Sequence, residues 1–209
     1  MQFYNEFKDT RRTQNRLPHR QQEGISLFVT YRLNDSIPAE LMEKWREEKN
    51  RWLTEHPQPW DEETDSAYHR RFTYELDRIM DGGHGSCVLK TAEIRAILEE
   101  SFRNFDGIRY DMHSWVIMPN HVHLLFSLKE GVKMEKILAT WKNYTSTRIN
   151  ESLGQEGTLW QKDYFDRMIR DWDNFARVAR YIRRNPVEAK LREGEFSYYE
   201  DEIVKRVLG

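Results

Sequence analysis

The order of apolar and polar residues along this chain of 209 residues predicts a small set of strands. Residues 24–33 (GISLFVTYRL) are rich in β-branched and aromatic side chains and alternate between an apolar and a mixed face, which predicts a strand inside a sheet. Residues 108–118 and 121–128 are two apolar runs separated by a Pro-Asn pair, a combination typical of a β-hairpin. A further strand is expected within residues 159–168.

Apolar residues at helical spacing predict the helices between these strands. Residues 91–105 and 134–150 each read as an amphipathic helix, and Thr91 is the expected N-cap of the first. Residues 173–184 carry another apolar stripe. Strands and helices alternate in the order βαββαβ, so we predict an α+β ferredoxin-like sandwich with an antiparallel sheet, in which residues 121–128 form a central strand.

Residues 34–83 interrupt this order with long charged helices, expected over residues 39–55 and roughly 62–80. The segment holds 13 Asp and Glu against 7 Lys and Arg, which makes it a poor surface for DNA. We interpret it as an acidic helical insertion into a single domain that spans residues 1–209. Whether it packs on the edge of the domain or limits access to a site is open at this point.

The cysteine content and the N-terminal residues indicate where the protein works. Cys87 is the single cysteine, so no internal disulfide can form and a reducing cytoplasm is expected. The N-terminus is polar, and no apolar run approaches the ~20 residues that span a bilayer. These features predict a cytoplasmic protein without a membrane partner.

Charge is unevenly distributed, although the formal net charge is only −2. Residues 133–192 carry 13 Lys and Arg against 8 Asp and Glu, and residues 1–23 carry 5 against 3. The acidic insertion offsets the positive charge of the rest of the chain in the total. Positive charge concentrated in this way is typical of a surface that binds the phosphates of a nucleic acid. Residues 1–23 are expected to form an irregular arm that is either flexible or lies on DNA.

Two histidines with one aliphatic residue between them form the most specific chemical feature. In an extended strand, His121 and His123 project to one side and Val122 to the other. Neutral imidazole nitrogens are common ligands of divalent metals, and a third ligand is needed to fix an ion. For a bare His-x-His pair, a strand that merely happens to carry two histidines is the competing interpretation.

Tyr181 and Asn185 lie four residues apart on the last predicted helix, so their side chains project from the same region. A tyrosine hydroxyl can attack phosphorus if it loses its proton, and an amide oxygen is a hard ligand that suits Mg²⁺ or Mn²⁺. The competing interpretations are a core-edge phenol for Tyr181 and a helix end before Pro186 for Asn185.

Three other residues were considered for the site. Tyr144 is a rival nucleophile on another predicted helix, but Arg148 occupies the position four residues later, and packing or base stacking is the expected role. His113 lies far along the chain from the histidine pair and is not included as a ligand. Trp160 can stack on a base or fill the core, and we expect the core.

Several motifs together resemble those of the HUH nucleases, and in detail those of the REP-associated tyrosine transposases. The motifs are WVIMPNHVHLLF at residues 115–126, Trp160-Gln161 with the aromatic pair that follows, and Tyr181-Ile182-Arg183-Arg184-Asn185-Pro186. The resemblance covers the first strand and most of residues 91–199. It implies that Tyr181 is the nucleophile and that His121, His123 and Asn185 hold Mg²⁺ or Mn²⁺.

The same resemblance implies the substrate. Single-stranded DNA with palindromic hairpins would be cut to leave a 5′-phosphotyrosine link and a free 3′-OH. Arginines near the tyrosine can neutralise its phosphates, and the candidates are Arg177, Arg184, Arg180 and Arg167. A hairpin-binding protein without cleavage and a metal-dependent phosphoesterase remain as alternatives, as do a monomer and a homodimer.

Overall fold

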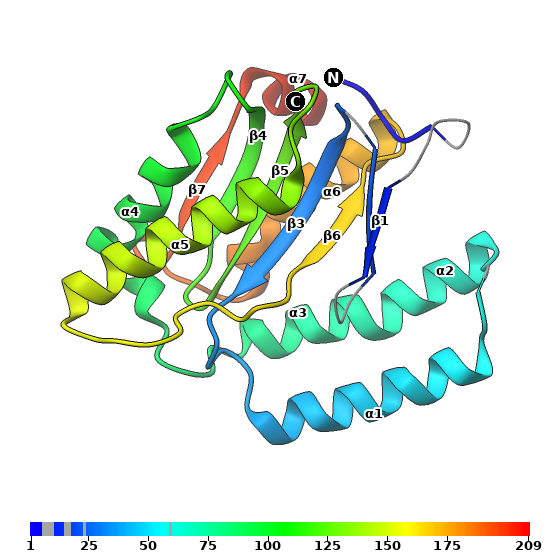
Figure 1. Ribbon diagram of the computed structural model, residues 1–209, viewed down its shortest axis with the longest axis horizontal. Coiled ribbons are helices and arrows are strands. Elements are labelled where there is room, and N and C mark those ends of the chain that lie inside the picture. Colours follow the sequence, from blue (N-terminus) through cyan, green and yellow to red (C-terminus); the bar gives the residue numbers. More distant parts are fainter. Residues whose placement is uncertain (6–10, 15–17, 23, 59) are drawn as a thin grey trace.

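The computed structural model describes residues 1–5, 11–14, 18–22, 24–58 and 60–209. Its centre is a five-stranded antiparallel sheet in the order β6-β3-β5-β4-β7, with β5 in the middle (Figure 1). The strands are β3 (Ser26–Arg32), β4 (Tyr110–Ile117), β5 (His121–Leu128), β6 (Phe165–Met168) and β7 (Ser197–Glu200).

Helices cover both faces of this sheet. The 3-10 turn Val88–Lys90, α4 (Ala92–Arg103) and α5 (Met134–Leu153) lie on one side, and α6 (Trp172–Glu188) and α7 (Glu202–Leu208) lie on the other (Figure 1). The chain therefore runs β3-α4-β4-β5-α5-β6 once the insertion is set aside. The predicted α+β ferredoxin-like βαββαβ arrangement with an antiparallel sheet and a central histidine strand is confirmed, while β7 is an additional strand that the sequence did not predict.

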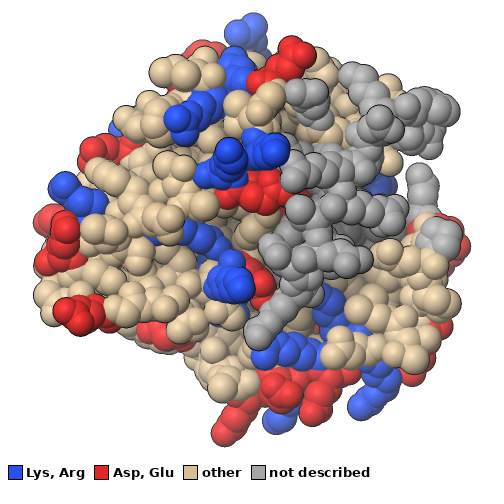
Figure 2. All heavy atoms as spheres, viewed as in Figure 1, with Lys and Arg blue, Asp and Glu red and all other residues tan. Residues whose placement is uncertain are grey.

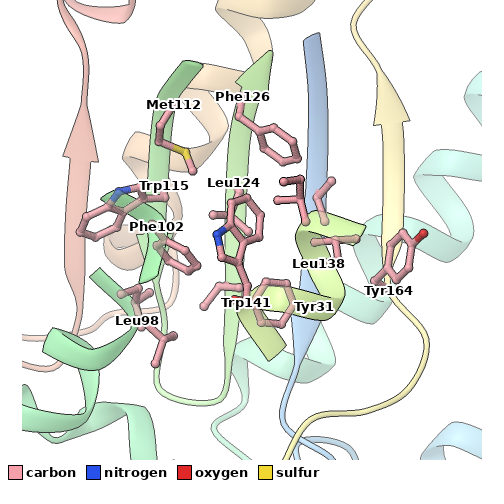
Figure 3. Packing of buried hydrophobic residues seen from close by; sticks show 14 of the residues in the cluster. Tyr31, Leu98, Phe102, Met112, Trp115, Leu124, Phe126, Leu138, Trp141 and Tyr164 are labelled. Carbon is pink, nitrogen blue, oxygen red and sulfur yellow. The ribbon is translucent and has the colours of Figure 1, made fainter. Parts of the chain in front are cut away.

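The alternation along β5 separates two apolar layers. Val122, Leu124 and Phe126 are fully buried on the side of α4 and α5, whereas Leu125 is buried on the side of α6. Figure 3 shows Trp141 of α5 against the sheet in the first layer, and its ring centroid lies 5.3 Å from those of Phe102 and Phe126. Because period-two alternation fixes the register, the histidines of β5 must face α6.

The acidic insertion is a pair of helices. It consists of α1 (Ala39–Glu55), α2 (Glu62–Tyr68), a π-helical segment (His69–Thr73) and α3 (Tyr74–Asp81), so both predicted helices are confirmed and the second contains a π-helical segment. Trp45, Trp52 and Phe72 form its own buried cluster. The Trp45 ring also meets Phe165 of β6 edge-on at 6.3 Å, which fixes the insertion to the edge of the sheet.

Two details of the helix ends differ from the expectations. Thr91 occupies the N-cap position of α4, as predicted, but its side chain makes no capping hydrogen bond. Helix α6 does not stop before Pro186 but continues to Glu188, so Asn185 lies inside the helix and is buried. A proline removes one backbone donor from a helix, and here the helical bonds resume when Ala189 N–H donates to the carbonyl of Asn185.

The N-terminal arm is not wholly irregular. Strands β1 (Arg11–Gln14) and β2 (Pro18–Gln21) pair antiparallel within it. The predicted contact of its arginines with DNA concerns side chains that lie outside the described residues. On the face that carries α4 and α5, described basic and acidic side chains are interspersed (Figure 2). None of the helices in the described ranges is long and apolar enough to cross a membrane.

Candidate metal and nucleophile site

His121 and His123 both point from β5 toward α6 and are fully buried. Their Nε2 atoms lie 3.1 Å apart. The register of β3 against β5 places Thr30 opposite His123, and the Thr30 hydroxyl lies 2.7 Å from Nδ1 of that ring. Nδ1 of His121 is likewise engaged, at 2.8 Å from the amide oxygen of Asn120.

The hydrogen bonds of Asn120 determine which nitrogen of His121 carries the proton. The Asn120 amide nitrogen donates to the carbonyl oxygens of Met80 at 3.1 Å and His84 at 3.0 Å. Its amide oxygen must therefore accept from Nδ1–H of His121, which leaves a lone pair on Nε2. Orientation of a histidine by a hydrogen bond at its other nitrogen is typical of metal sites.

Both rings are held in the neutral form. Burial lowers the pKa of His121 to about 3, with a smaller contribution from the nearby Arg32 guanidinium. Burial also lowers the pKa of His123 well below its ordinary value, and His121 adds to this effect. Neutral imidazoles can offer lone pairs to a metal without first losing a proton.

The structure brings Tyr181 to this pair from α6. Its hydroxyl lies 3.4 Å from Nε2 of His123 and donates to Oδ2 of Asp77 at 2.9 Å. Phe28 stacks on His123 and meets Tyr181 edge-on, which fixes the two rings relative to each other. Burial and the negative charge of Asp77 raise the pKa of the Tyr181 hydroxyl well above its ordinary value.

Two buried oxygens near these residues have no hydrogen-bond partner within the described part of the chain. They are Oδ1 of Asn185, one turn beyond Tyr181 on α6, and Oδ1 of Asp81, which lies 3.8 Å from Nε2 of His121. An unsatisfied buried oxygen is costly, at about 1–3 kcal/mol, and a cation would satisfy it. The donor set therefore fits a divalent metal on both nitrogen and oxygen ligands.

Asp77 and Asp81 are the site residues that the sequence analysis missed. Both lie on α3 of the insertion, and burial raises their pKa values to about 7 and about 6. The available signal was their spacing of four residues on one helix face, directly before Gly82 and Gly83. The insertion thus packs on the edge of the domain and also reaches the site.

A polar groove of about 530 Å³ leads to His121 from outside. Its walls come from residues 80–83, from Pro119 and from residues 189–192. Lys90 also lines the groove and pairs with Glu195 at 3.3 Å. The groove therefore reaches His121, the first histidine of the pair.

The four predicted DNA-binding arginines differ in their surroundings. Arg177, Arg180 and Arg184 are exposed on α6 at spacings of three and four residues, and so share one side of the helix. Arg167 on β6 is half-buried, and its charge acts to lower the pKa of Asp77. Arg183, by contrast, is tied to Glu200, with nitrogen–oxygen distances of 3.0 and 3.1 Å.

The residues set aside in the sequence analysis lie elsewhere. Tyr144 projects from α5 on the opposite side of the sheet, and its hydroxyl donates to Glu100 at 3.0 Å. His113 is buried between Asp201 and Ser127, which take up both of its nitrogens. Trp160 is buried in the core, as expected.

Comparison with known proteins finds one family similar to the central part of the chain. Residues 88–185 match the family model described as "Transposase IS200 like". None of the curated proteins matches the chain significantly. This match agrees with the resemblance that the motifs indicate, and the matched residues include His121, His123, Tyr181 and Asn185.

Two solved structures are similar to the chain at a low level. One is the REP-associated tyrosine transposase bound to a REP hairpin, with 17% identity, a TM-score of 0.42, and coverage of 80% of this chain and 69% of the other. The second is a candidate transposase of Deinococcus radiodurans R1, with 12% identity, a TM-score of 0.35, and coverage of 88% and 98%. These low scores leave the assignment to the family match and to the geometry of the chain itself.

Proposed function

We propose that this protein is a metal-dependent transposase that cuts and rejoins single-stranded DNA through Tyr181. One observation carries the proposal, namely the 3.4 Å distance between the Tyr181 hydroxyl and Nε2 of His123. A tyrosine hydroxyl close to nitrogens that could bind a metal supports this proposal, because transesterification at phosphorus needs a nucleophile and a metal side by side.

His121, His123 and Asn185 would hold the metal. The Nε2 atoms of the two histidines are 3.1 Å apart, close enough for both to bind one ion. The unpartnered oxygen of Asn185 favours Mg²⁺ or Mn²⁺ over softer ions. Such an ion would neutralise the phosphate and position the scissile bond. The amide oxygen of Asn185 would complete the set of ligands.

In the proposed reaction, the Tyr181 oxygen attacks phosphorus. The bond from phosphorus to this oxygen forms, the bond to the 3′ oxygen of the neighbouring nucleotide breaks, and a 5′-phosphotyrosine link and a free 3′-OH result. Rejoining is the reverse reaction with a different 3′-OH. Because the energy of the phosphodiester is kept in the tyrosine link, no external energy source is needed.

The proposed substrate is single-stranded DNA that folds into palindromic hairpins, as the motif resemblance implies. The exposed side of α6 formed by Arg177, Arg180 and Arg184 would contact its phosphates, and Arg167 would act closer to the nucleophile. Tyr181 meets histidines of its own chain, so a monomer suffices for the chemistry, although a homodimer is compatible with it. The expected location is the cytoplasm, where such DNA is accessible.

The direct test is to incubate the protein with a labelled hairpin oligonucleotide and Mn²⁺ and to look for an adduct on a denaturing gel. We expect an adduct that disappears with Tyr181→Phe and with His121→Ala and persists with Tyr144→Phe. Hairpin binding without any adduct would favour a protein that binds without cutting. Phosphodiester cleavage that survives Tyr181→Phe would favour a phosphoesterase that uses water.

A further inference from the structure

Asp77 belongs to the insertion, yet its carboxylate contacts the reacting atom of the proposed nucleophile. Oδ2 of Asp77 accepts a hydrogen bond of 2.9 Å from the Tyr181 hydroxyl, across 104 residues of sequence. Asp77 is buried and only 7% exposed. A buried carboxylate that receives its hydrogen bond from a nucleophile's hydroxyl is placed to take that proton.

We propose that Asp77 accepts the proton of Tyr181 during attack on DNA, so that the helical insertion supplies a catalytic residue. This inference rests on the function proposed above. It assigns to residues 34–83 a chemical task, in addition to their packing against the edge of the sheet.

The alternatives for this task are few. Among the residues that the structure describes, the groups within hydrogen-bonding range of the hydroxyl are Oδ2 of Asp77 at 2.9 Å and Nε2 of His123 at 3.4 Å. The lone pair on Nε2 of His123 is the one that a metal would occupy, so this nitrogen cannot also take a proton. Asp77 is then the remaining acceptor, at the shorter distance and with a favourable geometry.

The charges around Asp77 suit an acceptor that works near neutral pH. Burial raises the pKa of this carboxyl to about 7, opposed by the hydrogen bond from Tyr181 and the charge of Arg167 on β6, and assisted by Asp81 on the same helix. The negative charge of Glu188 on α6 also raises the pKa of the Tyr181 hydroxyl. A base whose pKa lies near the working pH is both deprotonated and strong enough to assist.

The position of Asp77 is fixed from both ends of α3. At its C-terminal end, the Met80 carbonyl accepts from Asn120, the residue that orients His121. Near its start, Phe72 packs edge-on against Trp45 of α1, which in turn contacts β6. Asp77 is therefore held relative to the histidine strand, as a proton acceptor must be.

The step balances without any further reactant. As phosphorus bonds to the Tyr181 oxygen, the hydroxyl proton passes to Oδ2 of Asp77, and the departing 3′ oxygen takes a proton from water. In rejoining, the incoming 3′-OH releases its proton to water, and the departing tyrosine oxygen takes back the proton from Asp77.

The experiment measures single-turnover adduct formation with Mn²⁺ from about pH 6 to 9 in the wild type, Asp77→Asn and Glu75→Gln. Glu75 lies on the same turn of α3 but on a different face, so its variant removes one negative charge from the helix without touching Tyr181. We expect Asp77→Asn to slow the adduct by about 10²–10⁴-fold with unchanged hairpin binding, and Glu75→Gln to match the wild type. Asp77→Glu, which keeps the carboxylate, should recover part of the rate.

The pH profile separates proton transfer from mere positioning. The wild-type rate should level off above about pH 7, whereas the Asp77→Asn rate should keep rising with hydroxide. An Asp77→Asn rate equal to the wild type, or lower with the same profile, would overturn the inference, as would a wild-type rate that climbs steadily to pH 9. The wild-type profile needs no variant to fold. If the wild type forms no Tyr181-dependent adduct at all, the proposed function itself fails.

Discussion

The amide oxygen of Asn120 accepts a hydrogen bond from Nδ1 of its neighbour His121, at 2.8 Å. The amide nitrogen of Asn120 donates hydrogen bonds to the carbonyl oxygens of Met80, at the end of the insertion, and of His84, just after it. One buried side chain thus connects the insertion to the histidine strand and fixes the tautomer of a proposed metal ligand.

This relationship predicts the effect of Asn120→Ala. Loss of a residue that orients a metal-binding histidine typically weakens metal binding by about 10–100-fold, because the ring loses its fixed tautomer. Mn²⁺ titration followed by electron paramagnetic resonance should show this loss. Asn143→Ala, at an exposed position of α5, is the control and should bind Mn²⁺ like the wild type.

Asn185→Leu tests the proposed oxygen ligand. Leucine is similar in volume and removes the buried oxygen that has no partner among the described residues. We expect Mn²⁺ affinity to fall at least about tenfold, while the metal-free protein loses no stability, since no hydrogen bond of that oxygen is given up. Unchanged Mn²⁺ affinity would remove Asn185 from the ligand set.

Asp77 should lower the free energy of unfolding as the pH rises. A salt-bridged carboxyl, whose pKa is lowered by folding, has the opposite effect. Its pKa is raised from 3.8 to about 7, so the folded state keeps a proton that the unfolded state releases above about pH 4. Asp77→Asn should therefore gain stability over the wild type by about 1.4 kcal/mol per pH unit between about pH 4 and 7, and no more above that.

Urea unfolding in EDTA at several pH values measures this difference. His121 and His123 stay neutral in the folded state, so the stability that they contribute is lost as the pH falls below about 6.5. This loss is the same in the wild type and in Asp77→Asn, so it cancels in the difference between them. A stability difference that does not change with pH would mean that Asp77 is not buried as a carboxyl in the native protein.

The arginines of α6 should make the affinity for hairpin DNA depend on the salt concentration. Arg177→Ala and Arg184→Ala should each weaken hairpin binding and reduce the slope of log affinity against log salt by about 0.7–0.9, the value of one phosphate contact. Arg183→Ala is the matched control, because its guanidinium is occupied by Glu200. A slope that falls equally in all three variants would contradict a specific role for the exposed side of α6.

Local patterns predicted the parts of the fold and site that depend on nearby residues. The apolar run after Pro119 and Asn120 predicted where β5 begins and ends. The alternation of side chains along a strand predicted that His121 and His123 share one face. Helical spacing of four placed Asn185 one turn from Tyr181. These relationships are set within a few residues of chain, so the sequence carries them.

Long-range packing determined what the sequence did not reveal. Asp77 meets Tyr181 only because α1 and α3 pack together and dock on β6, and no local pattern encodes that docking. Helix α6 continues through Pro186 to Glu188, although proline removes one backbone donor, and its apolar stripe, which includes Ile182, is buried against the sheet. The short strand β7 has only four residues, too few for an alternating pattern, and it pairs with β4.

The most direct test of the account is to identify the residue that becomes linked to DNA. The wild-type adduct, formed with Mn²⁺ on a hairpin oligonucleotide, is digested with protease and nuclease and analysed by tandem mass spectrometry. We predict a nucleotide attached through its 5′ phosphate to the hydroxyl of Tyr181. Attachment to Tyr144 or to any other residue, or cleavage that leaves a free 5′ phosphate and no linked peptide, would contradict the account.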